Sequence, residues 1–268
     1  MIDAALTRAV HALMREAAER AILPRYRALA RHEVSEKAAD DLVTIADRES
    51  EDILAAGLAR LLPEAAIVGE EAAHADPALL ARLGEDLFWI IDPLDGTNNF
   101  AAGKPPFGVL VALAERGETI GGWLYDPQRE RFCHAAAGRG AFIDGERIRA
   151  RSSSHAPPIA AISLIFMDPA RREQVKAHIA PHYTVVDIPR CAAEQYPRLV
   201  LGQNDVSIFE RTLPWDHAAG VLFLNEAGGK AARLDGSPYL VREHERPGMI
   251  GASTPALWDE LAERMERL

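Results

Sequence analysis

Residues 87–100 read LFWIIDPLDGTNNF, an apolar run that ends in two aspartates three residues apart, Asp92 and Asp95. A continuous apolar run of this length, followed by turn residues, predicts a strand that is buried on both faces. Such a strand would carry Asp92 to its carboxyl end, where α/β sheets present ligand sites. Two acids at this place repel each other unless a proton or a cation lies between them. We therefore take this segment as the centre of a candidate site.

Two further acidic segments stand where predicted strands end or helices begin. Residues 69–71 read Gly-Glu-Glu after the short apolar run 66–68, and residues 215–217 read Trp-Asp-His before an apolar stretch. Each segment alone fits a solvated loop or a helix N-cap. Taken together, four acids from three segments favour hard cations such as Mg²⁺, held together with a substrate phosphate. These acids are Glu70, Asp92, Asp95 and Asp216.

The spacing of the acids and the absence of other motifs exclude several rival chemistries. Phosphatases that form an aspartyl phosphate place two aspartates at i and i+2 on one face of a strand end, whereas the interval here is three. A calcium loop of the EF-hand type that began at Asp92 would need Glu at its twelfth position, which is Gly103. The sequence also lacks the P-loop, the nucleophile elbow and the zincin helix motif.

The composition indicates a folded chain of one large domain or two smaller ones. Of its 268 residues, 48% are hydrophobic and 26% are charged. The 40 acidic residues exceed the 30 basic ones and give a net charge of −10, which argues against a nucleic-acid polymer as partner. The apolar runs are too short to cross a membrane, and the start of the chain does not have the order of a signal peptide. We expect a cytoplasmic protein that does not bind membranes.

The pattern of apolar residues and turn signals divides the chain into two halves. The first half predicts helices over 2–24 and 47–62, a loop over 31–41, and an antiparallel meander over 107–148. From residue 159 onward, strands alternate with helices. The serine-rich stretch 151–158 is the best boundary, and it separates a lobe of residues 1–150 from a lobe of residues 151–268.

Residues 89–100 resemble the signature of the inositol monophosphatase-like, lithium-sensitive, magnesium-dependent phosphatases, an apolar strand followed by Asp-Pro-[Leu/Ile]-Asp-Gly-Thr. The Gly-Glu-Glu upstream and the Trp-Asp-x-Ala-[Ala/Gly]-Gly downstream occur in the order of that family, and residues 41–47 are similar to its segment between the first two helices. The resemblance implies an α/β fold, a layered α-β-α-β-α sandwich with a largely antiparallel first sheet and a mixed second sheet. It also implies a homodimer and sensitivity to lithium.

The resemblance also implies a ligand set and a reaction. The activity would be that of a phosphoric monoester hydrolase, in which water activated by metal attacks the phosphate of a small metabolite and no phosphoenzyme forms. The implied ligands of two to three Mg²⁺ ions are four carboxylates and one backbone carbonyl, those of Glu70, Asp92, Leu94, Asp95 and Asp216. The implied catalytic residues are Glu70, Asp95 and Thr97, with Thr97 and Glu70 orienting the water. The N–H groups of Gly96 and Thr97 would receive the phosphate, and Asp216, Glu210 and Arg211 would face the rest of the substrate.

Two departures from the family leave the substrate open. Inositol-specific relatives carry Gly-[Ser/Thr]-Ala where residues 190–192 read Arg-Cys-Ala, and they place a Glu seven residues before the last aspartate, whereas Glu210 lies six before it. Inositol monophosphate, histidinol phosphate, fructose bisphosphate and a 3′-phosphonucleotide all remain candidates. A regulator that senses metal and ligand without catalysis is the alternative from another class.

Several side chains near these motifs have ordinary structural interpretations beside the functional ones. Asp47 fits a helix N-cap about as well as a group that supports Thr97. His217 fits a solvated or locally bonded residue better than a site residue, and Arg190 and Glu194 fit ion pairs about as well as substrate contacts. The role of Lys37, a loop lysine close to its place in the family, stays open as well.

Overall fold

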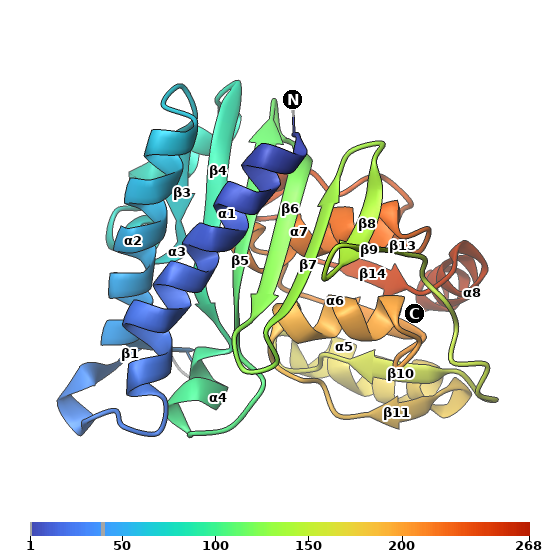
Figure 1. Ribbon diagram of the computed structural model, residues 1–268. Coiled ribbons are helices and arrows are strands. Elements are labelled where there is room, and N and C mark those ends of the chain that lie inside the picture. The colour runs from blue at the N-terminus through green and yellow to red at the C-terminus, as the bar shows by residue number, and fades with distance from the viewer. Residues whose placement is uncertain (1, 39–40) are drawn as a thin grey trace.

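The computed structural model describes residues 2–38 and 41–268 and arranges them in alternating layers of helix and sheet (Figure 1). Strand order in the larger sheet is β3-β4-β5-β6-β7-β8-β9. Strand β3 (Ala66–Gly69) runs parallel to β4 (Leu87–Asp95), and every other neighbouring pair is antiparallel. The remaining strands of this sheet are β5 (Gly108–Glu115), β6 (Glu118–Asp126), β7 (Arg131–Ala136), β8 (Gly140–Ile143) and β9 (Glu146–Ile148). The predicted meander and the largely antiparallel first sheet are confirmed.

The second sheet is mixed, as the resemblance implied. Its order is β11-β10-β12-β14-β13, and its central strand β12 (Val206–Phe209) is parallel to β10 (Ile159–Ile162) and antiparallel to β14 (Met249–Ala252). Strand β11 (Thr184–Val186) pairs in parallel with β10, and β13 (Lys230–Arg233) pairs antiparallel to β14. The predicted alternation of strands and helices in the second half is confirmed.

Helices fill the space on both sides of each sheet (Figure 1). Helices α1 (Ala4–Ala17) and α2 (Ile45–Leu61) cover the outer face of the first sheet. Helices α6 (Ala192–Val200) and α7 (Pro214–Glu226) lie between the two sheets. Helix α8 (Pro255–Met265) packs on the second sheet, and helix α5 (Pro169–Gln174) leads into the segment Val175–Ile179, which packs there as well. This succession is the expected layered sandwich.

The apolar character of β4 follows from its place between two helical layers. Trp89 and Ile91 pack into the core shared with α1 and α2, whereas Phe88 and Ile90 pack into the core shared with α6 and α7. Because side chains alternate along a strand, both faces must be apolar, and all four residues are at most 1% exposed. The strand therefore places its carboxyl end, with its two aspartates, deep inside the molecule.

The prediction of a loop over residues 31–41 was wrong. Strands β1 (Val34–Ala38) and β2 (Asp41–Thr44) form a small antiparallel sheet in which Val34 lies opposite Thr44. Ser35 and Glu36 are exposed, so this short strand buries too little to show a periodic apolar pattern. The Lys37 side chain lies outside the described residues.

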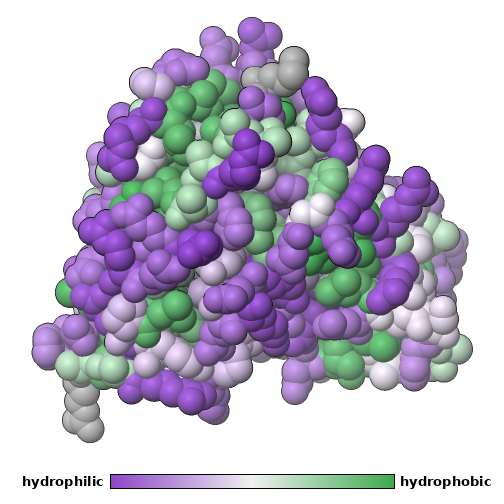
Figure 2. Space-filling model, viewed as in Figure 1, coloured by the Kyte–Doolittle hydropathy of each residue, from purple (hydrophilic) through white to green (hydrophobic). Residues whose placement is uncertain are grey.

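The surface and the connections add two points about the organisation of the chain. The face shown in Figure 2 is mainly hydrophilic, with hydrophobic residues in separate patches. Within the described ranges, no helix is long and apolar enough to cross a membrane. The chain passes from the first sheet to the second between residues 148 and 159, where the boundary was expected. The division into two lobes stays a prediction.

Candidate metal centre and active site

A β-bulge in β4 brings Asp92 and Asp95 to the same cavity. Asp92 lies opposite Leu110 of β5 and Asp95 lies opposite Gly108, so β4 fits one more residue than its partner between these points. Residues three apart on a regular strand point to opposite faces, and the extra residue of a bulge removes that difference. Pro93 has no N–H to offer to a sheet ladder and is well tolerated at a bulge.

Asp216 in the first turn of α7 completes a group of three carboxylates. Asp92, Asp95 and Asp216 each offer an oxygen, and these oxygens lie within 4.8 Å of one another. Asp92 is 1% exposed and Asp95 is 7% exposed. Burial raises the pKa of Asp92 well above its ordinary value, and the negative charges of Glu70, Asp95 and Asp216 raise it further. The cluster therefore favours a state in which a proton or a cation offsets its charge.

Parallel pairing of β3 and β4 delivers Glu70 to the same place. Gly69, the last residue of β3, lies opposite Ile91, so Glu70 and Asp92 follow their strands at one edge of the sheet. Glu70 begins the short helix α3 (Glu70–Ala75). Together with the three aspartates it lines a cavity of about 180 Å³. All four acids singled out in the sequence thus meet in one cavity.

Glu51 of α2 fixes the start of α3. Its carboxylate accepts hydrogen bonds from the N–H groups of Glu71 and Ala72, each at 2.8 Å. Burial raises the pKa of Glu51 to about 7, although these two hydrogen bonds act in the opposite direction. No local sequence pattern points to Glu51, because its partners lie about twenty positions away along the chain.

The turn after Asp95 needs a glycine and positions a hydroxyl. Gly96 has a φ of 83°, and a Cβ atom there would lie 2.9 Å from the carbonyl oxygen of Pro106. Thr97 then begins α4 (Thr97–Ala101). Its hydroxyl oxygen lies 2.9 Å from Asp47 Oδ1 and 2.8 Å from the carbonyl oxygen of Leu94. Since the hydroxyl has one hydrogen, it donates to one of these acceptors at a time.

Asp47 contacts Thr97, as considered from the sequence, whereas the alternative that Asp47 is the N-cap of α2 was wrong. The N-cap of α2 is Thr44, and Asp47 stands at the third helical position, where its Oδ2 accepts from the Thr44 N–H at 2.8 Å and from the Thr44 hydroxyl at 2.6 Å. Its Oδ1 holds Thr97. Burial raises the pKa of Asp47 to about 7, against the effect of the Thr44 hydroxyl. Asp47 thereby ties the first turn of α2 to the turn that carries Thr97.

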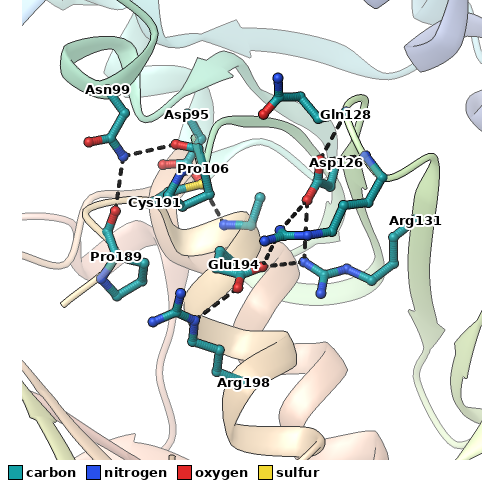
Figure 3. Close-up of polar contacts among 12 residues, drawn as sticks. Asp95, Asn99, Pro106, Asp126, Gln128, Arg131, Pro189, Cys191, Glu194 and Arg198 are labelled. Carbon is teal, nitrogen blue, oxygen red and sulfur yellow. Dashed lines mark hydrogen bonds and ion pairs between the residues drawn. The ribbon is translucent and has the colours of Figure 1, made fainter. Parts of the chain in front are cut away.

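Residues from the second half of the chain donate hydrogen bonds to Asp95 (Figure 3). Asp95 Oδ2 accepts a hydrogen bond from the N–H of Ala193 at 2.6 Å and from the thiol of Cys191 at 3.0 Å. Burial raises the pKa of this thiol well above its ordinary value, so it remains a donor. Asn99 adds a further link, because its amide donates to the carbonyl oxygens of Pro106 and Pro189 at 2.8 and 2.9 Å.

Glu194 belongs to a network of ion pairs and is not among the described residues that line the cavity. Its carboxylate accepts from Arg131 at 2.5 Å, from Arg129 at 3.0 Å and from Arg198 at 2.9 Å (Figure 3). Arg129 also donates to Asp126 at 2.6 Å. Burial raises the pKa of Glu194, but these arginines outweigh that effect and hold it below its ordinary value. The ion-pair interpretation is the one that the geometry favours.

The remaining substrate-side residues of the sequence analysis do line the cavity. Arg190, Glu210 and Arg211 stand on its wall, and Arg211 Nη2 lies 3.9 Å from Asp216 Oδ2. The Arg211 guanidinium also lies over the ring of Phe166, 4.1 Å from its centroid. Phe166 lines the cavity as well, although no sequence motif surrounds it and none predicted it.

His217 is buried, so of the two expected states, solvated or locally bonded, the structure has a bonded ring. One ring nitrogen lies 2.7 Å from the Tyr196 hydroxyl, and the other lies 3.0 Å from the carbonyl oxygen of Arg211. Burial lowers the pKa of His217 to about 3, which keeps the ring neutral. Its contacts hold α6 and the segment before α7 together, and the residue itself lines the cavity.

Comparison with known proteins places the chain in one family. A model described as the inositol monophosphatase family matches residues 3–268. The chain belongs to this family. The inositol-1-monophosphatase of Bacillus subtilis is 31% identical over 208 residues, which cover 76% of this chain and 77% of the relative. The Nus factor SuhB of Escherichia coli is 30% identical over 251 residues, which cover 88% and 89%.

Solved structures of inositol monophosphatase-like proteins share the fold. The Thermotoga maritima IMPase has a TM-score of 0.79 and 25% identity, and the match covers 96% of this chain and 95% of that one. The extragenic suppressor protein suhB of Bartonella henselae has a TM-score of 0.83 at 24% identity, with 98% and 99% covered. The α/β fold expected from the sequence is therefore shown.

Proposed function

We propose that this member of the inositol monophosphatase family is a Mg²⁺-dependent phosphomonoesterase that hydrolyses a small phosphorylated metabolite by direct attack of water, without a phosphoenzyme. The observation that carries the proposal is the convergence of Asp92, Asp95 and Asp216 within 4.8 Å, with Glu70 in the same cavity. The Bacillus subtilis relative, named inositol-1-monophosphatase, makes inositol monophosphate the first substrate to test.

The donor atoms of the site fit Mg²⁺. Mg²⁺ prefers hard oxygen ligands and is commonly held by carboxylates together with substrate phosphate. Glu70, Asp92, Asp95 and Asp216 supply carboxylates, and Leu94, which lines the same cavity, would add its backbone carbonyl oxygen. When bound, two or three such ions would polarise the phosphate and lower the pKa of a water molecule.

The residues of the chain itself then orient the reactants. The Thr97 hydroxyl, held by Asp47, would position the attacking water, and the Glu70 carboxylate would accept its proton. Gly96, which lacks a side chain, would allow the phosphate to approach the backbone N–H groups of Gly96 and Thr97. Glu210 and Arg211 would contact the alcohol part of the substrate, because both line the cavity beside Asp216.

A panel of phosphate monoesters, assayed for phosphate release with Mg²⁺ and with chelator, tests the proposal. The panel contains inositol 1-phosphate, histidinol phosphate, fructose 1,6-bisphosphate and a 3′-phosphonucleotide. Asp92→Asn and Asp216→Asn should each lower turnover by at least about a hundredfold, whereas Asp86→Asn, at an exposed position before β4, should have no effect. Turnover that survives in either site variant would refute the metal scheme.

The name of the Escherichia coli relative, a Nus factor, favours a second candidate function. In that case the chain would bind metal and ligand as a regulator and release no phosphate. The same panel separates the two candidates, because a regulator gives thermal stabilisation by Mg²⁺ without hydrolysis of any ester. Lithium inhibition and a homodimer remain predictions, for which lithium titration of the activity and light scattering are the measurements.

A further inference from the structure

The second sheet contributes a crevice of its own to the cavity. Strand β10 lies between β11 and β12 and is parallel to both, so the chain leaves β10 toward one side and then returns to the other. In open α/β sheets, ligands bind at such a point, outside the carboxyl ends of the strands. Ser163 follows β10 and Phe209 ends β12, and both line the cavity that contains the acids. The alcohol part of a substrate can therefore extend from the acids into this crevice.

Gln195 of α6 is a buried polar side chain at this crevice. It is 4% exposed and lines the cavity, and its Nε2 donates to the hydroxyl oxygen of Ser207 on β12 at 2.6 Å. Ser207 lies opposite Ala161 of β10, which lines the cavity too. The contact with Ser207 thus holds Gln195 where β10 and β12 meet. Gln195 belongs to none of the motifs in the sequence.

One polar end of the Gln195 carboxamide is left without a partner. Its Oε1 is buried and has no hydrogen bond to any residue that the structure describes. Buried polar atoms are nearly always hydrogen-bonded, so an unpartnered one in the wall of a ligand cavity indicates a bond that the ligand supplies. If the carboxamide were turned by half a rotation, Nε2 would be the unpartnered end instead. A hydroxyl group on the ligand pairs with either end, because it both donates and accepts.

We propose that Gln195 is a specificity-determining residue, whose unpartnered carboxamide end forms a hydrogen bond with a hydroxyl group on the alcohol part of the substrate. The inference rests on the proposed phosphomonoesterase function. The phosphate then lies at the acids, and the far side of the alcohol lies in the crevice between β10 and β12. An apolar alcohol of the same size is disfavoured there, because it leaves the buried carboxamide end unpaired.

The test compares inositol 1-phosphate with cyclohexyl phosphate, an ester of a ring of the same size that has no further hydroxyl groups. Gln195→Met replaces the carboxamide with an apolar side chain of similar length. It should lower kcat/KM for inositol 1-phosphate by about tenfold, the effect of one lost hydrogen bond in a buried site, and change the value for cyclohexyl phosphate by less than about twofold. The control is Gln203→Met, because Gln203 is exposed and is not among the described residues that line the cavity.

Equal losses on the two esters would mean that Gln195 only supports the wall through Ser207, and they would overturn the proposal. An unchanged kcat/KM for inositol 1-phosphate, or a wild-type protein that prefers cyclohexyl phosphate, would overturn it as well.

If inositol 1-phosphate is not hydrolysed, its calorimetric binding in the presence of Mg²⁺ decides the role of Gln195. Binding about tenfold weaker in Gln195→Met supports the hydrogen bond, whereas unchanged binding, or no binding to the wild type, refutes it. Failure of the phosphomonoesterase function is recognised separately, because in that case no ester of the panel releases phosphate.

Discussion

The substitution Glu194→Gln tests how strongly the ion pairs behind the site hold the fold together. Glu194 is 4% exposed and accepts hydrogen bonds from three arginines, of which Arg131 has a side chain only 14% exposed. Removal of one charge from a buried pair commonly costs about 3–5 kcal/mol. Asp126 still faces Arg129 and Arg131, so we expect a loss near the lower limit, about 3 kcal/mol.

Thermal and urea unfolding at pH 7 in the presence of chelator measure this loss. At about 2–4 °C per kcal/mol, the melting temperature should fall by about 6–12 °C. The pKa of Glu194 lies below its ordinary value, so its contribution is complete at neutral pH and is lost only as the pH falls through that lowered pKa. The difference between wild type and variant should therefore narrow in acid.

The control is Glu260→Gln on α8, which removes one exposed partner of Arg264 in a pair four residues apart. Such pairs contribute about 0.3–0.5 kcal/mol, so its melting temperature should change by no more than about 2 °C. If the two variants lose similar stability, the Glu194 network is a surface feature and the reasoning is wrong.

The same variant has a consequence for the metal site. Glu194 stands next to Ala193, whose N–H donates to Asp95, and loosening the start of α6 should weaken that hydrogen bond. Groups that orient metal ligands from outside typically change affinity by about 10–100-fold. The Mg²⁺ concentration that gives half of the maximal thermal stabilisation should rise about tenfold in Glu194→Gln and stay constant in Glu260→Gln.

Three further predictions concern charge and packing. Without metal, Asp92→Asn should stabilise the protein by about 0.5–2 kcal/mol in urea unfolding, because a buried charge is removed, and Mg²⁺ should then add little; a destabilised variant would contradict this. The fold raises the pKa of Asp47 and that of Glu51 to about 7, from about 4 in the unfolded chain. Each protonated carboxyl therefore contributes stability that is complete below pH 4 and is lost as the pH rises through 7. Metal-free protein should therefore melt higher at pH 6 than at pH 8 in a fluorescence melting scan, by up to about 1.4 kcal/mol per pH unit for each group, and an opposite slope would disprove the assignment. Gly220→Ala places a Cβ 2.0 Å from the Tyr196 ring and should cost about 1–3 kcal/mol, whereas Gly84→Ala has open space and should be neutral in the same unfolding assay.

The order of elements could be predicted because apolar pattern and turn chemistry are local signals. The apolar run before Asp92 and the meander after Phe107 both depend on the neighbours of each residue along the chain, and both are confirmed. The small sheet of β1 and β2 has no such signal, since Ser35 and Glu36 face water. A strand that buries little cannot be distinguished from a loop by periodicity.

The convergence of the acids was predicted, but the reason for it could not be read from the sequence. On a regular strand, residues three apart such as Asp92 and Asp95 would point to opposite faces of the sheet. Only the pairing with β5 reveals the bulge that places both side chains in the cavity. The donors that hold Asp95 come from Cys191 and Ala193, nearly a hundred residues away. Such contacts depend on the packing of α6, which no local pattern encodes.

The way the candidate site is built would link metal binding, as proposed, to the joining of the two halves of the chain. Asp95 and Asp216 come from different halves, and Asp95 accepts hydrogen bonds from Cys191 and Ala193 at the start of α6. Burial of these carboxylates opposes their charged form. In the metal-free protein, the acids therefore stay close together only because the packing of the surrounding layers keeps them there. A cation that binds the folded arrangement and not the unfolded chain stabilises the fold by an amount that grows with the logarithm of the ratio of its concentration to its dissociation constant. The melting temperature should hence rise with Mg²⁺ concentration, and Glu194→Gln, which should bind the ion more weakly, should need a higher Mg²⁺ concentration for the same rise.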